Sequence, residues 1–322
     1  RNGGAEHREG IEPGALVGRL RLFAGRAAPE RQVEHPLGWL IRRGTSLRSV
    51  CPPIRRMVPV WLTDTVTSDL NRALHYTQLW GLHGMELRTV GGPDDRIPFV
   101  NEKQIREQLE GTDLLLSSVV PSMFEGPVSD RAAWMNDLLQ FEDTLELCRR
   151  VGCPRVTISP FAAEPGASLE PMAEALQQAG EKAAEYDFLV AVRNGPETAC
   201  PTGQALAELL SRVDAPNVRA AWNPVGALRA GEDPATGLTA LAGLVTLVRC
   251  SDGRVEGGRW VDTPLGDGAV GWAEQLEQLS AQGFQGPISL EMFLEPRPKH
   301  GLRSATTLIR MIRTVRAAAP SD

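Results

Sequence analysis

Residues 188–223 read FLVAVRNGPETACPTGQALAELLSRVDAPNVRAAWN, and the architecture of the whole chain can be worked out from the pattern in this segment. Two short apolar runs, Phe188–Arg193 and Val218–Asn223, flank a longer amphipathic stretch at Thr202–Val213. Short apolar runs predict buried strands, and an amphipathic stretch between them predicts a helix that joins parallel strands. The segment therefore predicts one strand-helix-strand unit of an α/β fold.

The same alternation extends in both directions from this unit. The predicted strands are Val58–Leu62, Gly84–Val90, Asp113–Val119, Arg155–Ser159, Phe188–Arg193, Val218–Asn223, Val245–Arg249 and Pro287–Glu291. The predicted helices are Thr67–Trp80, Glu102–Leu109, Asp130–Val151, Leu169–Tyr186, Thr202–Val213, Pro234–Leu241, Trp272–Gln282 and Leu302–Ala318, and Gly81, Gly111, Gly152 and Gly283 mark helix ends. Eight such pairs in about 265 residues predict a closed (β/α)8 TIM barrel. A Rossmann-like sheet is disfavoured, because no G-x-G-x-x-G follows the first strand.

The first 56 residues differ from the rest in composition and pattern. They hold 11 arginines against 5 glutamates, many glycines and prolines, and no sustained helical or strand period. They also lack the apolar stretch of a signal peptide. We expect residues 1–56 to be a largely disordered extension, and residues 57–322 to form one barrel domain that begins at Met57.

Composition and charge exclude several classes of protein. The chain is 42% hydrophobic and 23% charged, which is ordinary for a globular protein. Its net charge of −6 divides into +6 for residues 1–56 and −12 for residues 57–322, which disfavours nucleic acid as a partner. No apolar run approaches the roughly 18 to 20 residues of a membrane helix. Five scattered cysteines predict buried free thiols in a reducing, cytoplasmic compartment.

The residues at the predicted carboxyl ends of the strands, where TIM barrels place their chemistry, are mostly polar. These residues are Asp64, Glu86, Arg88, Pro121, Ser159, Arg193, Asn194, Asn223, Arg249, Asp252 and Glu291. Most of them are charged, so this end of the barrel is the predicted functional site.

Three segments resemble a known family: GMELR at 84–88, LGDGAVGW at 265–272 and GFQGPISLE at 283–291. They are similar to the xylose isomerase-like TIM barrels called sugar phosphate isomerases/epimerases, over about residues 57–318. The resemblance implies a divalent metal (Mn, Zn, Co or Mg) held by Glu, Asp, His and Glu after strands five to eight. It also implies that the two glutamates move a proton between carbons next to a carbonyl, which the metal polarises.

The chain departs from this ligand pattern at three of the four positions. Arg193 stands at the first Glu position, Asn223 at the Asp position and Arg249 at the His position, so that only Glu291 remains. A guanidinium stays protonated and has no lone pair for a metal. We therefore predict no metal at the carboxyl end of the barrel, which we call its mouth, and no other cofactor.

The remaining charges predict a replacement for the metal. Arg193 and Arg249 are expected to converge on Glu291, either as a buried ion-pair network or as an anion-binding pair. Glu86 is expected to pair with Arg88, and either Glu86 or Asp252 would supply a second catalytic carboxylate. Further ligand contacts are predicted from Asp252 in the loop after strand seven, from Trp222 as an apolar wall, and from Lys299 in the loop after strand eight.

Two functions follow from these predictions. The first is an isomerase or epimerase that acts on a sugar-like or polyol substrate, with Glu291 as the base and an arginine that stabilises the enediolate. The second is a catalytically inactive barrel that binds a sugar acid or a partner protein. A small sugar-like molecule is the expected ligand, and the sequence leaves both activity and homo-oligomerisation open.

Overall fold

The structure is a computed structural model that describes residues 54, 56–92 and 94–318. The predicted extension therefore lies outside the described residues, apart from Ile54 and Arg56. Within the described residues, eight parallel strands form one sheet in the order β1-β10-β7-β6-β5-β4-β3-β2. They are β1 Val58–Trp61, β2 Gly84–Leu87, β3 Leu115–Val119, β4 Arg155–Ile158, β5 Leu189–Arg193, β6 Val218–Trp222, β7 Val245–Cys250 and β10 Pro287–Leu290.

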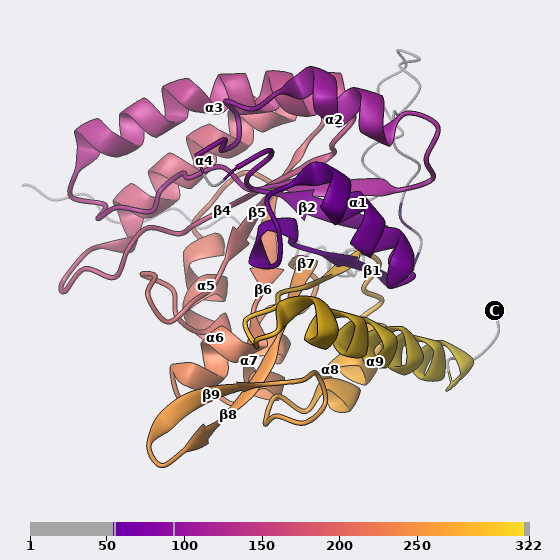
Figure 1. Cartoon of the computed structure of the whole chain (residues 1–322). Coiled ribbons are helices and arrows are strands. Elements are labelled where there is room, and N and C mark those ends of the chain that lie inside the picture. Colours follow the sequence, from indigo (N-terminus) through magenta and orange to yellow (C-terminus); the bar gives the residue numbers. More distant parts are fainter. Residues whose placement is uncertain (1–53, 55, 93, 319–322) are drawn as a thin grey trace, which may run out of the picture. The chain divides into compact units, whose positions relative to one another are not determined.

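The sheet closes into a barrel through contacts between β1 and β2, the two strands at the ends of this order. A parallel bridge joins Leu62 to Glu86, and the His83 amide donates to the Pro59 carbonyl at 3.0 Å. Helices lie around the outside of the strands (Figure 1). They are α1 Leu70–Leu79, α2 Glu102–Leu109, α3 Arg131–Val151, α4 Leu169–Ala184, α5 Gly203–Leu210, α6 Pro224–Arg229, α7 Pro234–Ala240, α8 Trp272–Ala281 and α9 Arg297–Ala318, with a short 3-10 turn at Thr63–Thr65. The predicted (β/α)8 barrel is confirmed.

Local sequence explains where the helices begin and end. The side chains of Asp69, Asn101, Asp130, Ser168 and Thr202 each accept a hydrogen bond from a first-turn amide. Such caps satisfy amides that have no partner inside the helix. The four glycines predicted to end helices all adopt left-handed φ angles between 69° and 72°.

Strand periodicity divides the apolar residues between two locations. Ala191, Ala221 and Leu247 form a separate small cluster of fully buried side chains, one from each of three neighbouring strands, inside the barrel. Most other buried apolar side chains belong to one large cluster that includes strand and helix residues. Because side chains alternate along a strand, Arg193 and Arg249, two residues beyond Ala191 and Leu247, also face inward at the carboxyl end.

Three parts of the chain differ from the predictions. The segment after β7 is an antiparallel hairpin of β8 Asp252–Glu256 and β9 Arg259–Thr263, where a loop was expected. Helix α6, which Asn223 caps and Pro224 starts, was not predicted. Helix α9 begins at Arg297, five residues before the predicted Leu302, so its first turn takes up residues that were placed in a loop.

The other findings on the barrel concern cysteines and membranes. Among the described residues, Cys148, Cys153, Cys200 and Cys250 are buried free thiols, as predicted, whereas Cys51 lies outside these residues. Burial raises the pKa of the Cys200 thiol to about 12, which makes it a poor nucleophile. Over the same part of the chain, no helix has both the length and the apolar character needed to cross a bilayer.

Helices α5 and α7 approach closely at a pair of glycines. A Cβ added to Gly203 would overlap the Gly237 carbonyl oxygen. We expect Gly203→Ala to lower the free energy of unfolding by about 1–3 kcal/mol, because the helix backbones would have to separate. Gly92→Ala is the control, since a Cβ there meets no atom within 4 Å. Denaturant unfolding measures both, and equal stability of the two variants would contradict the close approach.

Candidate functional site

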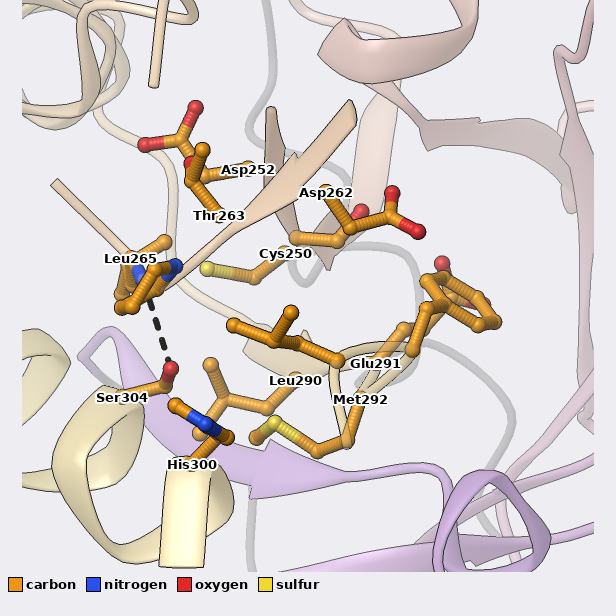
Figure 2. A pocket seen from close by; sticks show the side chains of 14 residues that line it. Cys250, Asp252, Asp262, Thr263, Leu265, Leu290, Glu291, Met292, His300 and Ser304 are labelled. Atoms are coloured by element: carbon orange, nitrogen blue, oxygen red, sulfur yellow. Dashed lines mark hydrogen bonds between the residues drawn. The ribbon is translucent and has the colours of Figure 1, made fainter. Parts of the chain in front are cut away.

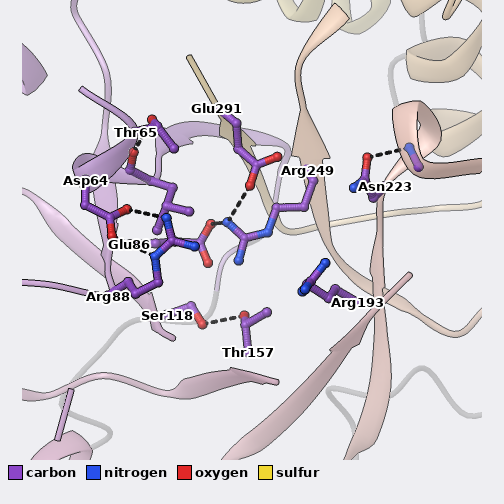
Figure 3. Close-up of polar contacts among 12 residues, drawn as sticks. Asp64, Thr65, Glu86, Arg88, Ser118, Thr157, Arg193, Asn223, Arg249 and Glu291 are labelled. Carbon is purple, nitrogen blue, oxygen red and sulfur yellow. Dashed lines mark hydrogen bonds and ion pairs between the residues drawn. The ribbon is translucent and has the colours of Figure 1, made fainter. Parts of the chain in front are cut away.

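One guanidinium bridges two carboxylates at the carboxyl end of the barrel (Figure 3). Arg249 Nη1, from β7, donates to Glu86 Oε1 of β2 at 2.8 Å. The same nitrogen lies 3.7 Å from Oε1 of Glu291, the residue that follows β10. The Arg249 side chain is 2% exposed, that of Glu86 0% and that of Glu291 15%. Glu291 is therefore the member of this triad that solvent or a ligand can reach.

Burial dominates the electrostatics of Glu86. Removal from water raises the pKa of its carboxyl, and the Arg249 charge and the nearby Ser289 hydroxyl oppose that rise. By hydrogen-bond geometry, Glu86 Oε2 has no partner in the described part of the chain. Arg249 is thus the largest favourable influence that offsets the cost of burying the charged Glu86 carboxylate.

The expected pair of Glu86 with Arg88 is wrong. Arg88 instead makes a bidentate ion pair with Asp64, from Nε to Oδ2 at 2.6 Å and from Nη2 to Oδ1 at 3.0 Å. The parallel geometry of a guanidinium and a carboxylate makes this a strong, directional contact. Arg88 also lies within electrostatic range of Glu291, so the Arg88–Asp64 pair borders the same mouth.

The expected convergence of both arginines on Glu291 is correct for Arg249 alone. Arg193 Nη1 donates to Glu197 Oε1 at 2.6 Å, and the Arg193 side chain is 28% exposed. Burial favours a higher pKa for Glu197, but the hydrogen bond and charge of Arg193 outweigh it and the pKa is lowered. Because Arg193 and Glu197 lie four residues apart around the end of β5, this local pairing competes with the longer reach to Glu291.

Asn223 and Trp222 hold the barrel together at the end of β6. The Asn223 side chain accepts from the Gly226 amide at 3.0 Å, and its backbone amide donates to Asn194 Oδ1 at 2.8 Å. Trp222 is fully buried and donates its indole N–H to Gln275 Oε1 of α8 at 3.0 Å. Its ring therefore lies on the helix side of the sheet, away from the mouth where a sugar wall was expected.

Asp252 organises a loop rather than standing free in one. Its carboxylate accepts from the amides of Gly253, Gly266, Gly268 and Val270 at 2.9 to 3.4 Å. Burial raises the pKa of Asp252, and these four hydrogen bonds oppose the rise. The last three amides belong to the LGDGAVGW segment, whose Gly268 has no room for a Cβ beside the carboxylate. The segment's glycines thus serve to wrap the backbone around Asp252.

This arrangement predicts an unequal effect of two Asp→Asn changes. In Asp252→Asn one oxygen and the charge are lost, so amides that faced Oδ2 lose an acceptor, and we expect about 2 kcal/mol of destabilisation. Asp233→Asn is the control, because Asp233 caps α7 through Oδ1 and asparagine caps almost as well. Thermal or denaturant unfolding compares them. A neutral Asp252→Asn would show that the carboxylate does not hold the loop.

A small cavity lies where the hairpin, the end of β10 and the start of α9 meet (Figure 2). Its volume is about 20 Å³, which suits about one water molecule rather than a sugar. His300 and Ser304 of α9 line it, and Ser304 Oγ accepts from the Leu265 amide at 3.3 Å. Lys299 is exposed in the first turn of α9, so the loop position predicted for it is wrong.

Comparison with known proteins places this barrel in a family. The model of the xylose isomerase-like TIM barrel family matches residues 74–314, and the chain belongs to that family. A search of curated proteins finds no match to the chain.

Solved structures share the fold at low sequence identity. A structure of L-ribulose 3-epimerase has a TM-score of 0.68 and 15% identity, and covers 81% of this chain and 96% of its own. The IOLI protein, solved with a bound zinc atom, has a TM-score of 0.64 and 17% identity over 81% of this chain and 97% of its own. D-allulose 3-epimerase from Methylomonas sp., solved with D-allulose, has a TM-score of 0.64 and 16% identity over 80% and 97%.

The residues at the mouth do not fit the divalent metal that the family resemblance implies. Among residues 54, 56–92 and 94–318, no three His, Cys, Asp or Glu side chains gather closely enough to hold a metal ion. The Arg249 guanidinium already lies between Glu86 and Glu291, where a cation between the two carboxylates would have to sit. A second positive charge at 4 Å would be opposed by about 4 kcal/mol per unit charge. We therefore derive no chemical step through a metal.

Proposed function

We propose that the mouth of this barrel binds a small sugar-like or polyol ligand and that Arg249, rather than a divalent metal, supplies the fixed positive charge there. The observation that carries the proposal is the position of the Arg249 guanidinium, 2.8 Å from Glu86 and 3.7 Å from Glu291. Sugar epimerases among the structural neighbours support the ligand class, since they share the fold.

The proposed chemistry is proton transfer next to a carbonyl. The Glu291 carboxylate takes a proton from the hydroxyl-bearing carbon beside the carbonyl, which leaves an enediolate, and returns that proton to the former carbonyl carbon. A second proton passes from the hydroxyl oxygen to the former carbonyl oxygen, so the carbonyl moves by one carbon and no atom is gained or lost. Arg249 and Arg88, both within electrostatic range of Glu291, stabilise the negative charge that develops on the enediolate.

The burial of Glu86 points to a single base. Glu86 is fully buried and paired with Arg249, and Asp252 is committed to four backbone amides. In this proposal Glu86 positions Arg249, and Glu291 alone moves the proton. One base can carry a proton between adjacent carbons on one face of the substrate. We therefore favour isomerisation over an epimerisation that needs bases on both faces.

A second candidate is a barrel that binds the same ligand class without turning it over. The observation that favours it is the contact of Arg249 with both carboxylates, because these contacts occupy the guanidinium that would otherwise stabilise an enediolate. The two candidates share the binding site and differ only in turnover.

The test is ligand binding in the presence of a chelator. Neutral aldoses, ketoses and polyols are screened by thermal shift in EDTA, since a ligand that binds only the folded state raises the melting temperature. We expect at least one to stabilise the protein equally with and without EDTA. Stabilisation that appears only when a divalent metal is added would contradict the proposal.

A further inference from the structure

A second group of side chains extends the mouth away from Glu291. Arg193 leaves the carboxyl end of β5 facing inward and donates to Glu197, whose side chain is 60% exposed. Arg229, an exposed residue at the end of α6, also acts electrostatically on Glu197. Arg193 therefore holds the Glu197 carboxylate directly, Arg229 adds a second positive charge within electrostatic range, and the three side chains carry a net charge of +1.

The hairpin after β7 supports this group from one side. The Arg229 guanidinium carbon lies 5.8 Å from the centroid of the Trp260 ring, within the range of a cation–π contact. The Trp260 indole N–H donates to Asp262 Oδ1 at 2.8 Å, which fixes the ring on β9. On β8 the ring lies over Gly253, where a Cβ would overlap it. The hairpin is thus built to hold an indole against Arg229.

Taken together, the geometry assigns an anion-binding subsite to Arg193 and Arg229, which we propose takes the carboxylate or phosphate of a sugar-like ligand. Trp260 is a positioning residue that holds Arg229 through its ring, and Glu197 occupies Arg193 until the ligand anion displaces it. This inference rests on the proposed function for the rest of the ligand, whose sugar part would reach toward Glu291.

Three physical features favour an anion over a neutral group here. Arginine presents planar donors that match a carboxylate or a phosphate in two parallel hydrogen bonds. Arg193 and Arg229 are both open to solvent, so the site needs no rearrangement of the core. Glu197 already shows how an acidic group docks on Arg193, at 2.6 Å. A ligand anion can take that place when the exposed Glu197 side chain turns away.

The experiment compares three ligands with one five-carbon skeleton, together with inorganic phosphate. D-ribose is neutral, D-ribonate carries a carboxylate and D-ribose 5-phosphate carries a phosphate, so their dissociation constants separate the charge from the sugar. We expect at least one anionic ligand to bind about tenfold more tightly than ribose, with an affinity that falls as salt is raised. Binding of inorganic phosphate at the same residues would show that the anion alone is recognised.

Variants assign this preference to named residues. Arg193→Ala and Arg229→Ala should each remove most of the preference, and Trp260→Ala should weaken it. Glu197→Gln should strengthen anion binding, because it removes the internal competitor. The matched control is the Arg212–Glu208 pair, also four residues apart at 3.1 Å, where Arg212→Ala and Glu208→Gln should change nothing.

The outcomes separate this inference from the proposed function. Equal affinity for ribose and both anions, or a preference that survives Arg193→Ala and Arg229→Ala, overturns the anion subsite. Binding of a neutral sugar at the mouth would still stand in that case. Tighter binding of ribonate than of ribose 5-phosphate identifies a carboxylate ligand. The opposite order of affinities identifies a phosphate ligand. Binding by none of the four probes contradicts the subsite and the sugar-binding mouth together.

Discussion

Replacing Arg249 with methionine is expected to lower the free energy of unfolding by about 3–5 kcal/mol, because it leaves the Glu86 carboxylate buried without its partner. Glu86 is fully buried, and Arg249 is its hydrogen-bond partner at 2.8 Å. The double variant Glu86→Leu with Arg249→Met should recover most of the loss, since it removes both buried charges and fills the space with apolar atoms. Arg212→Met, which breaks an exposed pair, should change stability by less than about 0.5 kcal/mol.

The loss should also depend on pH. The pKa of Glu86 is raised in the folded state, so the folded protein binds the proton more tightly and becomes less stable as pH rises from 4.5 through the raised pKa. Without Arg249 the pKa rises further and this window widens. Denaturant unfolding of Arg249→Met should therefore show a larger deficit at about pH 8 than at about pH 5. A variant as stable as the parent at both pH values would show that Glu86 and Arg249 are not a coupled buried pair.

The second large effect is expected at Glu291. If Glu291 is the base, Glu291→Gln should slow proton transfer by about 100- to 10,000-fold while ligand binding is largely kept. The measurement is the incorporation of deuterium from solvent into the carbon beside the carbonyl of a bound sugar, followed by NMR. Glu107→Gln is the control, because Glu107 is exposed on α2 and pairs only weakly with Lys103, at 3.6 Å.

Three results can be told apart in this assay. Exchange by the parent that disappears in Glu291→Gln supports the isomerase. Binding without exchange by the parent supports the barrel that binds but does not turn over its ligand. Exchange that survives Glu291→Gln contradicts the assignment of the base. The same assay on Glu86→Gln would then show whether Glu86 is the base instead.

Much of the fold could be predicted because barrel strands and helices carry strong local periodicity. Helix α2 falls at the predicted Glu102–Leu109, and each of the eight barrel strands lies within two or three residues of its prediction. The hairpin was missed although its signal is present, since Gly257-Gly258 separates two short runs with strand character. Likewise Asn223-Pro224 is a helix start, but α6 has only six residues and too little periodicity to be noticed.

The candidate site was harder to predict, because its contacts depend on which side chains can touch across strands that are distant in the sequence. The position of every charged residue at the strand ends followed from the fold, but the pairing did not. Glu86 and Arg249 are 163 residues apart, and only the closed barrel brings them together across its axis. Arg193 pairs instead with Glu197, four residues away, whose carboxylate lies 2.6 Å from its guanidinium. Trp260 lies on the hairpin and Arg229 on α6, and neither element was predicted, so their contact could not be predicted either.

The most direct test of a guanidinium in place of a metal is the metal content of the purified protein, measured together with its melting temperature in chelator and in added Mn²⁺, Zn²⁺, Co²⁺ or Mg²⁺. We predict no stoichiometric metal and the same melting temperature in every condition, because the Arg249 guanidinium already lies between Glu86 and Glu291. One metal ion per chain, lost in EDTA and lost again in Glu291→Gln, would contradict this arrangement of charges and restore a metal site at the mouth.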